Sequence, residues 1–355
     1  LEITVDRDYQ KFIDKLINLF PHEKEGIKNF YQTCWSVFNC LNSMPLLSIE
    51  DPAYLMKVFF KSPLSCLGLA RWLPVNAGDV ARRYIKDPNL LRFIDIECYC
   101  WSVMPSDLTP MINAGMVFSD RHYGGINYPK GGVGIIAEKL VKGIESLDGE
   151  IRYKSKVEKI IFEKGKAIGV SLENNEKIFG KTVVSNSTRW DTFGGEGVNH
   201  PLVQQDIIPP SEKKWNRRYK PSPSFLSIHL GVNAEAIPTN THCHHLLLEK
   251  WEEMEKEQGV TFVSIPTLLD STLAPSGSHI VHAFTPSSMD NWDGLSNKEY
   301  LAKKKEDGDK LISKLEKLFP NLSQNILHKE VGSPRTHKRF LSRNKGSYGP
   351  IPSIR

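Results

Sequence analysis

The beginning of the chain shows apolar side chains at helical spacing. Between residues 12 and 20 they recur every three or four positions, which predicts an amphipathic helix, and beyond Pro21 the same spacing predicts a second helix over 27–41. Residues 1–5 alternate between apolar and polar side chains instead, and this pattern predicts a strand. We therefore expect a short strand that leads into a helical region.

The segment 55–75 is more apolar than an ordinary surface helix. Lys57, Lys61 and Arg71 interrupt a run of leucine, valine, phenylalanine and tryptophan side chains, and two prolines prevent one continuous helix. One interpretation is an anchor that lies in the plane of a membrane surface, with its lysines and arginine reaching the headgroups. The other is a pair of core helices. The sequence leaves both interpretations open.

A regular succession of elements is predicted from Gly131 onward. Apolar side chains over 136–147 mark one face of a helix, and Gly149 follows as its C-terminal cap. Alternating side chains then predict a sheet whose last strand ends at Ser185 and Asn186. The strands of this sheet are expected over 150–153, 156–162, 167–172 and 178–184. Three further strands and a charged helix, which suggest a second sheet, are expected over 225–231, 262–265, 279–284 and 300–319.

Composition and charge exclude some classes of protein. The 355 residues are 40% hydrophobic and 25% charged, and the formal net charge of +5 comes from scattered basic residues, so we expect a globular protein without a nucleic-acid partner. Six cysteines without regular spacing predict reduced, mostly buried thiols. No apolar run approaches the roughly 20 residues of a membrane-spanning helix. Because the chain opens on Leu1 and closes on turn residues over 346–355, we expect it to begin and end inside a domain.

The stretch 132–137 fits the G-x-G-x-x-G/A pattern of a dinucleotide-binding loop. That loop needs a buried apolar strand before its first glycine, whereas the polar, proline-containing segment 127–130 precedes it here. We therefore do not assign a phosphate loop. The glycines indicate either close approach of the backbone to a flat ligand or a tight turn before a helix.

Two groups of potential metal ligands have structural interpretations. Strand alternation along 242–245 sends two histidines to one face and Cys243 with His245 to the other, and no second ligand pair follows at useful spacing. We predict a strand-edge cluster and no metal site. Cys98 and Cys100 share one face of a strand-like segment, without C-x-x-C spacing, and are predicted to be buried packing residues.

Several segments resemble interior landmarks of the flavoprotein superfamily that includes amine oxidases and carotenoid desaturases. They are the turn 128–132, the strands that follow residue 156, and the strand end 183–186. The resemblance implies an α/β (mixed α+β) fold, in which a discontinuous, Rossmann-like FAD-binding domain is interleaved with a mixed-sheet substrate domain and a helical membrane-associated part. By position it implies backbone contacts to the cofactor at Pro129, Gly131, Gly132, Val157 and Asn186.

A narrower resemblance covers nearly the whole chain. The segments that carry it are 92–98, 109–114, 120–129, 188–193, 223–229 and 347–350, and they are similar to the carotenoid cis-trans isomerases of cyanobacteria, algae and plants. The resemblance implies redox-neutral isomerisation of poly-cis lycopene (prolycopene) to all-trans-lycopene with reduced FAD. It also implies a lipophilic polyene that enters from a membrane surface, in a plastid or in a cyanobacterial thylakoid or cytoplasmic membrane. The segments that complete the flavin site in this family are expected outside the chain.

The isomerisation also suggests a candidate acid. A carbon–carbon double bond rotates only while its bond order is lowered, for example by a proton that is added and then returned. Glu97 lies in an apolar, aromatic run, where burial would raise the pKa of a carboxyl group and suit proton donation. The alternative is a hydrogen-bonded structural carboxylate. Tyr99, Trp101, Tyr123 and Tyr128 line a polyene tunnel or fill a core under the same two interpretations.

These inferences give an expected domain organisation and three rival functions. The expected parts are a remnant strand of the FAD domain at 1–5, a helical substrate and membrane-associated region at 6–125, a middle FAD-domain segment at 126–193, a substrate domain at 194–335, and the start of the return to the FAD domain at 336–355. The rivals are a polyene desaturase or saturase of the same fold, a non-catalytic lipophile-binding membrane protein, and an NAD-dependent dehydrogenase.

Overall fold

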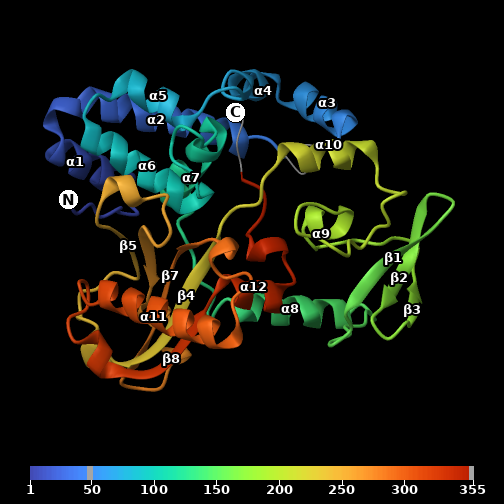
Figure 1. Cartoon of the computed structure of the whole chain (residues 1–355). Coiled ribbons are helices and arrows are strands. Elements are labelled where there is room, and N and C mark those ends of the chain that lie inside the picture. Colours follow the sequence, from blue (N-terminus) through green and yellow to red (C-terminus); the bar gives the residue numbers. More distant parts are fainter. Residues whose placement is uncertain (46–50, 352–355) are drawn as a thin grey trace. The chain divides into compact units, whose positions relative to one another are not determined.

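A computed structural model describes residues 1–45 and 51–351, and its chain divides into two compact units (Figure 1). The first unit contains residues 1–127 with Ile351, and the second contains Tyr128–Pro350. The described residues of the first unit form helices and loops, whereas the second unit also holds two antiparallel sheets. This combination confirms the predicted mixed α and β class. The predicted domain boundaries inside the second unit stay predictions.

The first unit packs amphipathic helices around an apolar core. Aspartate side chains cap three of them, since Asp8, Asp51 and Asp87 each accept a hydrogen bond from a backbone N–H of the first turn. The helices are α1 (Tyr9–Leu19), α2 (Lys24–Asn42), α3 (Pro52–Lys61), α4 (Pro63–Ala70), α5 (Ala77–Tyr84), α6 (Pro88–Ser102) and α7 (Met111–Tyr123). The core side chains include Phe12, Leu16, Ile27, Phe30, Leu90 and Ile94. Among the described helices, none is both long and apolar enough to cross a membrane.

Two predictions for the first unit are wrong. Residues 1–5 form no strand, because a strand needs a neighbour for its backbone hydrogen bonds and none of the described strands pairs with this segment. Cys98 and Cys100 lie on helix α6 rather than on a strand. The side chains of Leu90, Ile94 and Cys98 recur every four residues and are all buried, so the helical period takes precedence over the local alternation.

The second unit begins with helix α8 (Gly134–Glu145) and a small antiparallel sheet. Its strands are β1 (Val157–Glu163), β2 (Lys166–Leu172) and β3 (Lys177–Phe179), in the order β1-β2-β3. The predicted turn at Lys164 and Gly165 is confirmed, with φ values of +49° and +77°. The predicted strand over 150–153 is absent, and β3 ends at Phe179 instead of continuing to residue 184. Beyond Gly180, which donates to the Ile168 carbonyl, no described strand pairs with this segment.

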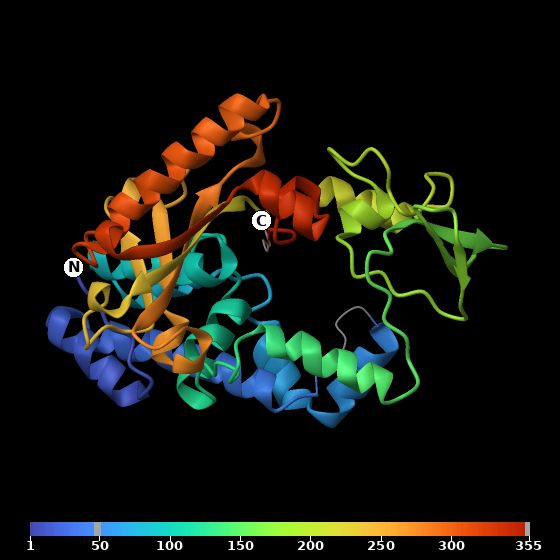
Figure 2. The ribbon, with the colours of Figure 1, turned by 90° about the horizontal axis from the view of Figure 1, so that it is seen from below.

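A five-stranded antiparallel sheet forms the larger part of the second unit. Its strands are β4 (Ser224–Asn233), β5 (His244–Leu248), β6 (Val260–Ser264), β7 (Ser278–Ser287) and β8 (Ile326–Gly332), in the order β5-β6-β7-β4-β8. Helix α11 (Asn297–Leu315) lies along one face, where Ile228, Leu230 and Leu311 join a buried cluster (Figure 2). The remaining helices are α9 (Arg189–Phe193), α10 (Pro210–Arg218) and α12 (Pro334–Leu341). Strands β4, β6 and β7 were predicted, whereas β8 was not.

Candidate functional site

The turn at residues 128–132, here called the glycine turn, precedes helix α8. The Gly132 N–H donates to the Pro129 carbonyl at 3.0 Å, and Gly131 and Gly132 have φ values of +89° and +85°, a conformation that other residues rarely adopt. The Gly131 N–H donates to Asp270 Oδ2 at 2.7 Å. This bond is the main reason that the pKa of Asp270 is lowered. The glycine turn is therefore tied to a loop beyond β6 rather than free in solution.

The other predicted cofactor residues lie elsewhere in the second unit. Val157 is the first residue of β1, and Asn186 is exposed in the loop that follows β3. Within the described residues, no hydrogen bond joins these two positions to the glycine turn. The residues fit the backbone contacts that a flat cofactor needs, because two glycines leave the turn without side chains and the Asn186 amide is accessible. The Gly131 N–H, however, already has Asp270 as its partner.

Helix α8 turns an apolar face to solvent. Ile136, Leu140 and Ile144 are 52%, 64% and 42% exposed, Leu147 just beyond the helix is 84% exposed, and α8 contains no buried residue. These are the side chains that the sequence assigned to a helix face. The helix prediction is therefore confirmed, while the apolar face that it was expected to bury has no partner in the described part of the chain.

Glu97, the predicted acid, forms a buried ion pair with Arg121. The guanidinium donates from Nη1 to Oε1 at 2.6 Å and from Nη2 to Oε2 at 3.0 Å, and both side chains are 8% exposed. Burial alone would lower the pKa of Arg121, but the charge and hydrogen bonds of Glu97 raise it above its usual value. Both carboxylate oxygens thus have a charged partner. This geometry agrees with the alternative of a structural carboxylate.

Helices α3 and α4 and the turn after α4 carry an apolar surface, defined here by Met56, Phe60, Leu64, Leu67 and Leu73. These side chains are between 55% and 83% exposed. Two residues of the same helices, Val58 and Leu69, are buried in the core of the first unit. The two interpretations of the apolar segment therefore apply to different faces, because one face packs in the core and the other is exposed. Lys57, Lys61 and Arg71 occur in the same segment.

The aromatic residues predicted to line a tunnel do not form one lining. Tyr99 is buried in the first unit, where Trp101 and Tyr123 are 50% and 65% exposed. Tyr128 belongs to the second unit. A different aromatic row, which the sequence analysis missed, lies in the second unit and is here called the aromatic strip. It consists of Tyr348, Phe225, Phe284 and Phe262, whose consecutive ring centroids are 4.7, 5.0 and 4.7 Å apart.

Two histidines lie on the same face of the five-stranded sheet as the aromatic strip. Strand register pairs His229 of β4 with His282 of β7 and with Glu330 of β8, and the two imidazole centroids are 4.6 Å apart. Burial lowers the pKa of both histidines, that of His282 to about 4. These imidazoles are therefore neutral near pH 7. The alternation of side chains along β4 and β7 shows in the sequence which residues share this face. Only the pairing of the two strands shows that the two histidines lie side by side.

The segment 242–245 has its own hydrogen bonds. His244 Nδ1 lies 2.9 Å from Ser264 Oγ on β6, and His245 Nε2 lies 2.8 Å from the carbonyl oxygen of His242. Cys243 Sγ contacts the carbonyl oxygen of Ile265 at 3.4 Å. Strand β5 is at the edge of its sheet, in agreement with the strand-edge prediction.

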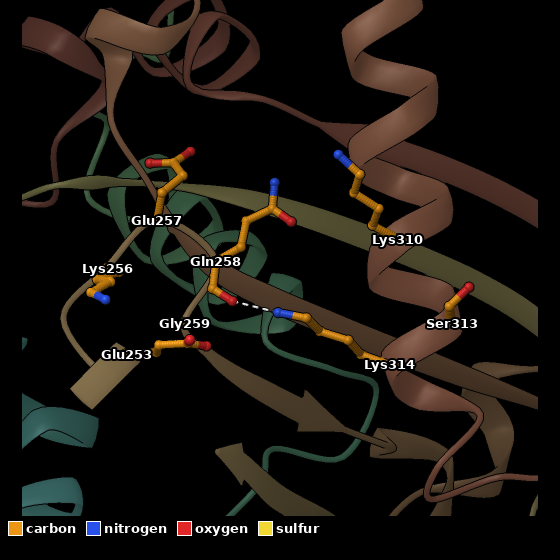
Figure 3. Close-up of a pocket in the computed structure, with 8 residues that line it drawn as sticks. All are labelled: Glu253, Lys256, Glu257, Gln258, Gly259, Lys310, Ser313 and Lys314. Carbon is orange, nitrogen blue, oxygen red and sulfur yellow. Dashed lines mark hydrogen bonds between the residues drawn. The ribbon is translucent and has the colours of Figure 1, made fainter. Parts of the chain in front are cut away.

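A hollow between residues 253–259 and helix α11 has a charged lining (Figure 3). Lys314 Nζ donates to the Gln258 carbonyl, and burial lowers the pKa of this lysine. Lys310 on the same helix pairs with Glu306 at 2.6 Å. Such a lining suits a polar occupant and does not suit a hydrocarbon.

Comparison with known proteins supports the narrower of the two resemblances, the one to carotenoid isomerases. Over 354 residues, 99% of this chain, it is 53% identical to the chloroplastic prolycopene isomerase of Daucus carota, and it covers 57% of that protein. The chain is related to the prolycopene isomerases. This confirms the resemblance to carotenoid isomerases, and the chain spans a little under three fifths of the length of the curated relative. No protein-family model matches the chain.

More distant similarities agree with this relationship. A neurosporene-forming phytoene desaturase of Cereibacter sphaeroides is 24% identical over 231 residues, which are 61% of this chain and 43% of the desaturase. Among solved structures, an oxidoreductase from Methanosarcina mazei matches with a TM-score of 0.54 and 20% identity, over 81% of this chain and 61% of its own. The structural match supports the predicted fold. Identity to the isomerase is more than twice that to the desaturase.

Proposed function

We propose that the protein that contains this chain isomerises poly-cis lycopene to all-trans-lycopene without net oxidation. The observation that carries the proposal is the 53% identity to a prolycopene isomerase over 99% of the chain. At this identity, sustained over nearly every residue, the substrate surfaces of the chain are expected to be shared with the relative. We also propose a plastid location, because the relative is chloroplastic.

The proposed cofactor is reduced FAD. Pro129, Gly131, Gly132, Val157 and Asn186 are the residues of this chain that would hold it, through their backbone atoms. The two positive-φ glycines support this role, because a side chain on either one would be strained and would stand between the backbone and a flat ring. When bound, reduced flavin supplies electron density that lowers the bond order of a conjugated double bond.

The proposed substrate route begins at a membrane surface. The exposed side chains of the apolar surface on α3 and α4 support this route, since Phe60 and Leu64 are 75% and 83% exposed. Apolar side chains of an amphipathic segment enter the boundary between headgroups and acyl chains, while Lys57 and Lys61 can stay at anionic headgroups. A hydrocarbon polyene dissolves in the same layer.

Glu97 remains a predicted acid for the reaction. Its two hydrogen bonds to Arg121 support a structural role, because donation of a proton would first require an uncharged carboxyl group beside a buried guanidinium. The catalytic assignment of Glu97 therefore depends on an experiment that separates stability from turnover.

Product analysis tests the proposed function. The complete gene product, supplied with reduced FAD, is incubated with vesicles that contain poly-cis lycopene, and the carotenoids are separated and weighed by mass spectrometry. The expected product is all-trans-lycopene of unchanged mass. Loss or gain of a pair of hydrogens would identify a desaturase or a saturase instead. Binding of the polyene without product and without flavin absorbance would identify a lipophile-binding protein.

A further inference from the structure

A group of buried polar atoms near helix α12 lacks hydrogen-bond partners. Among the described residues, these atoms include Ser224 Oγ and Ser227 Oγ of β4, His337 Nε2 of α12 and Ser347 Oγ in the segment after α12. The three serines are 1%, 7% and 1% exposed. Buried polar groups in proteins are almost always hydrogen-bonded to the protein, to ordered water or to a ligand. Ser224 and Ser227 are three positions apart on β4 and face opposite sides of the sheet, so the pair of interest is Ser227 Oγ with His337 Nε2.

Gly332, at the end of β8, lies against both Ser227 and His337. Register pairs Gly332 with Ser227. A Cβ atom at Gly332 would lie 2.6 Å from Ser227 Oγ and 3.7 Å from His337 Nε2. The serine hydroxyl and the imidazole nitrogen thus both lie next to a position without a side chain, and a methyl group at that position would clash with the hydroxyl.

The tautomer of His337 decides what can fill this space. The carbonyl of Phe225 accepts a hydrogen bond from the imidazole, and since Nε2 has no partner, the donor is Nδ1. Nε2 then carries a lone pair, so a neighbouring group must donate a hydrogen to it. Water satisfies this requirement and can accept from Ser227 at the same time, whereas a hydrocarbon cannot.

The aromatic strip begins beside the same imidazole. The ring centroids of His337 and Tyr348 are 6.3 Å apart, and Tyr348 is followed by Phe225 and Phe284. A conjugated hydrocarbon packs well against such rings. Phe225 and Phe262 are buried, whereas Tyr348 is 48% exposed. A polyene that lies against Tyr348 would therefore place one of its carbons near His337, on the same side of the sheet as Ser227.

We propose that His337 is the proton donor and acceptor of the isomerisation, with one water molecule held between it and Ser227. This inference rests on the proposed function. In the forward step the π electrons of one double bond take a proton from the held water and form a C–H bond, while the Nε2–H bond of the imidazolium breaks and restores the water; a delocalised cation free to rotate results. In the return step the C–H bond breaks, its electrons restore the π bond, and the proton returns through the water to Nε2. No electron is lost or gained.

Charged and titratable groups around His337 set the expected pH dependence. They are His229 on β4, Glu330 on β8, Arg343 and Tyr348 in the segment after α12, and Tyr300 on α11. Burial lowers the pKa of His337, and protonation of the neighbouring His229, which is neutral near pH 7, would lower it further. The imidazolium is consequently scarce at neutral pH and a stronger acid than ordinary histidine. The isomerisation rate should fall as pH rises through the neutral range.

The test is isomerisation in deuterium oxide by the complete gene product with reduced FAD. Protonation of a polyene carbon from the solvent pool leaves one deuterium in a fraction of the product, which mass spectrometry detects. His337→Asn keeps a side-chain N–H for the Phe225 carbonyl and removes Nε2, so thermal unfolding should change little. Its rate should fall about 100-fold, with loss of the deuterium label and of the pH dependence. His200→Asn, at an exposed position, is the matched control and should behave as the parent.

A second pair of variants examines the water site. Gly332→Ala places a methyl group in the space, and Ser227→Ala in the same chain removes the hydroxyl that this methyl group would meet. The double variant should regain the stability lost by Gly332→Ala, but not the rate. Full activity in the double variant would contradict the water site.

The outcomes separate the inference from the proposed function. If the parent forms all-trans product and a folded His337→Asn variant does so equally fast, the role of His337 is overturned and the proposed function stands. If the parent forms no all-trans product from the polyene, both are overturned. Deuterium in the parent product together with its loss in His337→Asn would support both.

Discussion

Replacement of Glu97 by glutamine is expected to destabilise the first unit strongly. The two carboxylate oxygens accept hydrogen bonds from Arg121 at 2.6 and 3.0 Å, and both side chains are 8% exposed. The Arg121 guanidinium also lies 5.0 Å from the centre of the Phe12 ring, so water cannot easily replace the lost charge. Removing one partner of a buried ion pair typically costs about 3–5 kcal/mol, and we expect this loss in the free energy of unfolding of Glu97→Gln.

Urea unfolding followed by circular dichroism measures this loss. A matched control is Glu249→Gln, which removes an exposed partner of Lys317 and should leave the urea midpoint unchanged. The double variant Glu97→Leu with Arg121→Met replaces the pair by apolar side chains and should recover most of the stability. A Glu97→Gln protein within about 1 kcal/mol of the parent would refute the structural role. If that stable protein also failed to isomerise the polyene, Glu97 would be the acid.

Three further predictions concern other parts of the chain. Burial lowers the pKa of His282 to about 4, so between pH 6.5 and 4 the unfolded state binds more protons and stability falls as the pH falls. After allowance for solvent screening, we expect this histidine to lower the free energy of unfolding by about 1–2 kcal/mol over that range. The measurement is the urea midpoint as a function of pH, which should depend less on pH in His282→Gln. An unchanged pH dependence in the variant would contradict the prediction. Changing Phe60 and Leu64 together to aspartate should weaken binding to anionic lipid vesicles about tenfold or more in flotation assays, whereas Leu327→Asp, at a 61% exposed position of β8, should not; equal losses in both would argue against the apolar surface. Gly132→Ala should lower the free energy of unfolding by about 1–2 kcal/mol because its φ is +85°, while Gly134→Ala, which meets open space in α8, should be neutral or slightly stabilising; thermal unfolding decides, and equal effects would contradict the turn geometry.

Sequence patterns predicted the helices and the hairpin turns more successfully than the strand ends. Helical periodicity is local, so the helices around residues 12–41 follow from spacing alone. A strand, in contrast, exists only where a partner supplies hydrogen bonds. This requirement explains why residues 1–5 and 180–184 alternate in sequence and yet form no strand in the described chain. Strand β8, which pairs with β4, was missed for the same reason, because its partner is remote in the sequence.

The candidate site also has parts that the sequence predicts and parts that depend on contacts between distant segments. The glycine turn could be predicted because its glycines are consecutive in the sequence. The environment of Glu97 could not, since its partner Arg121 lies on another helix, and local composition indicated burial without indicating the ion pair. The meeting of Ser227 and His337 depends on the register of β4 with β8 and on the position of α12. No pattern within either segment contains that information.

Helix α8 has consequences for local unfolding. It has 12 residues, and none of them is buried. Isolated helices of about 12–15 residues are marginally stable in water, because packing of the apolar face supplies most of the stability of a helix in a protein. The amide protons of α8 should therefore exchange with solvent by opening of this helix alone, long before those of α2, whose Ile27 and Phe30 are fully buried. Whatever covers Leu140 and its neighbours would slow that exchange, so hydrogen-exchange mass spectrometry on α8 can report directly when its apolar face is occupied.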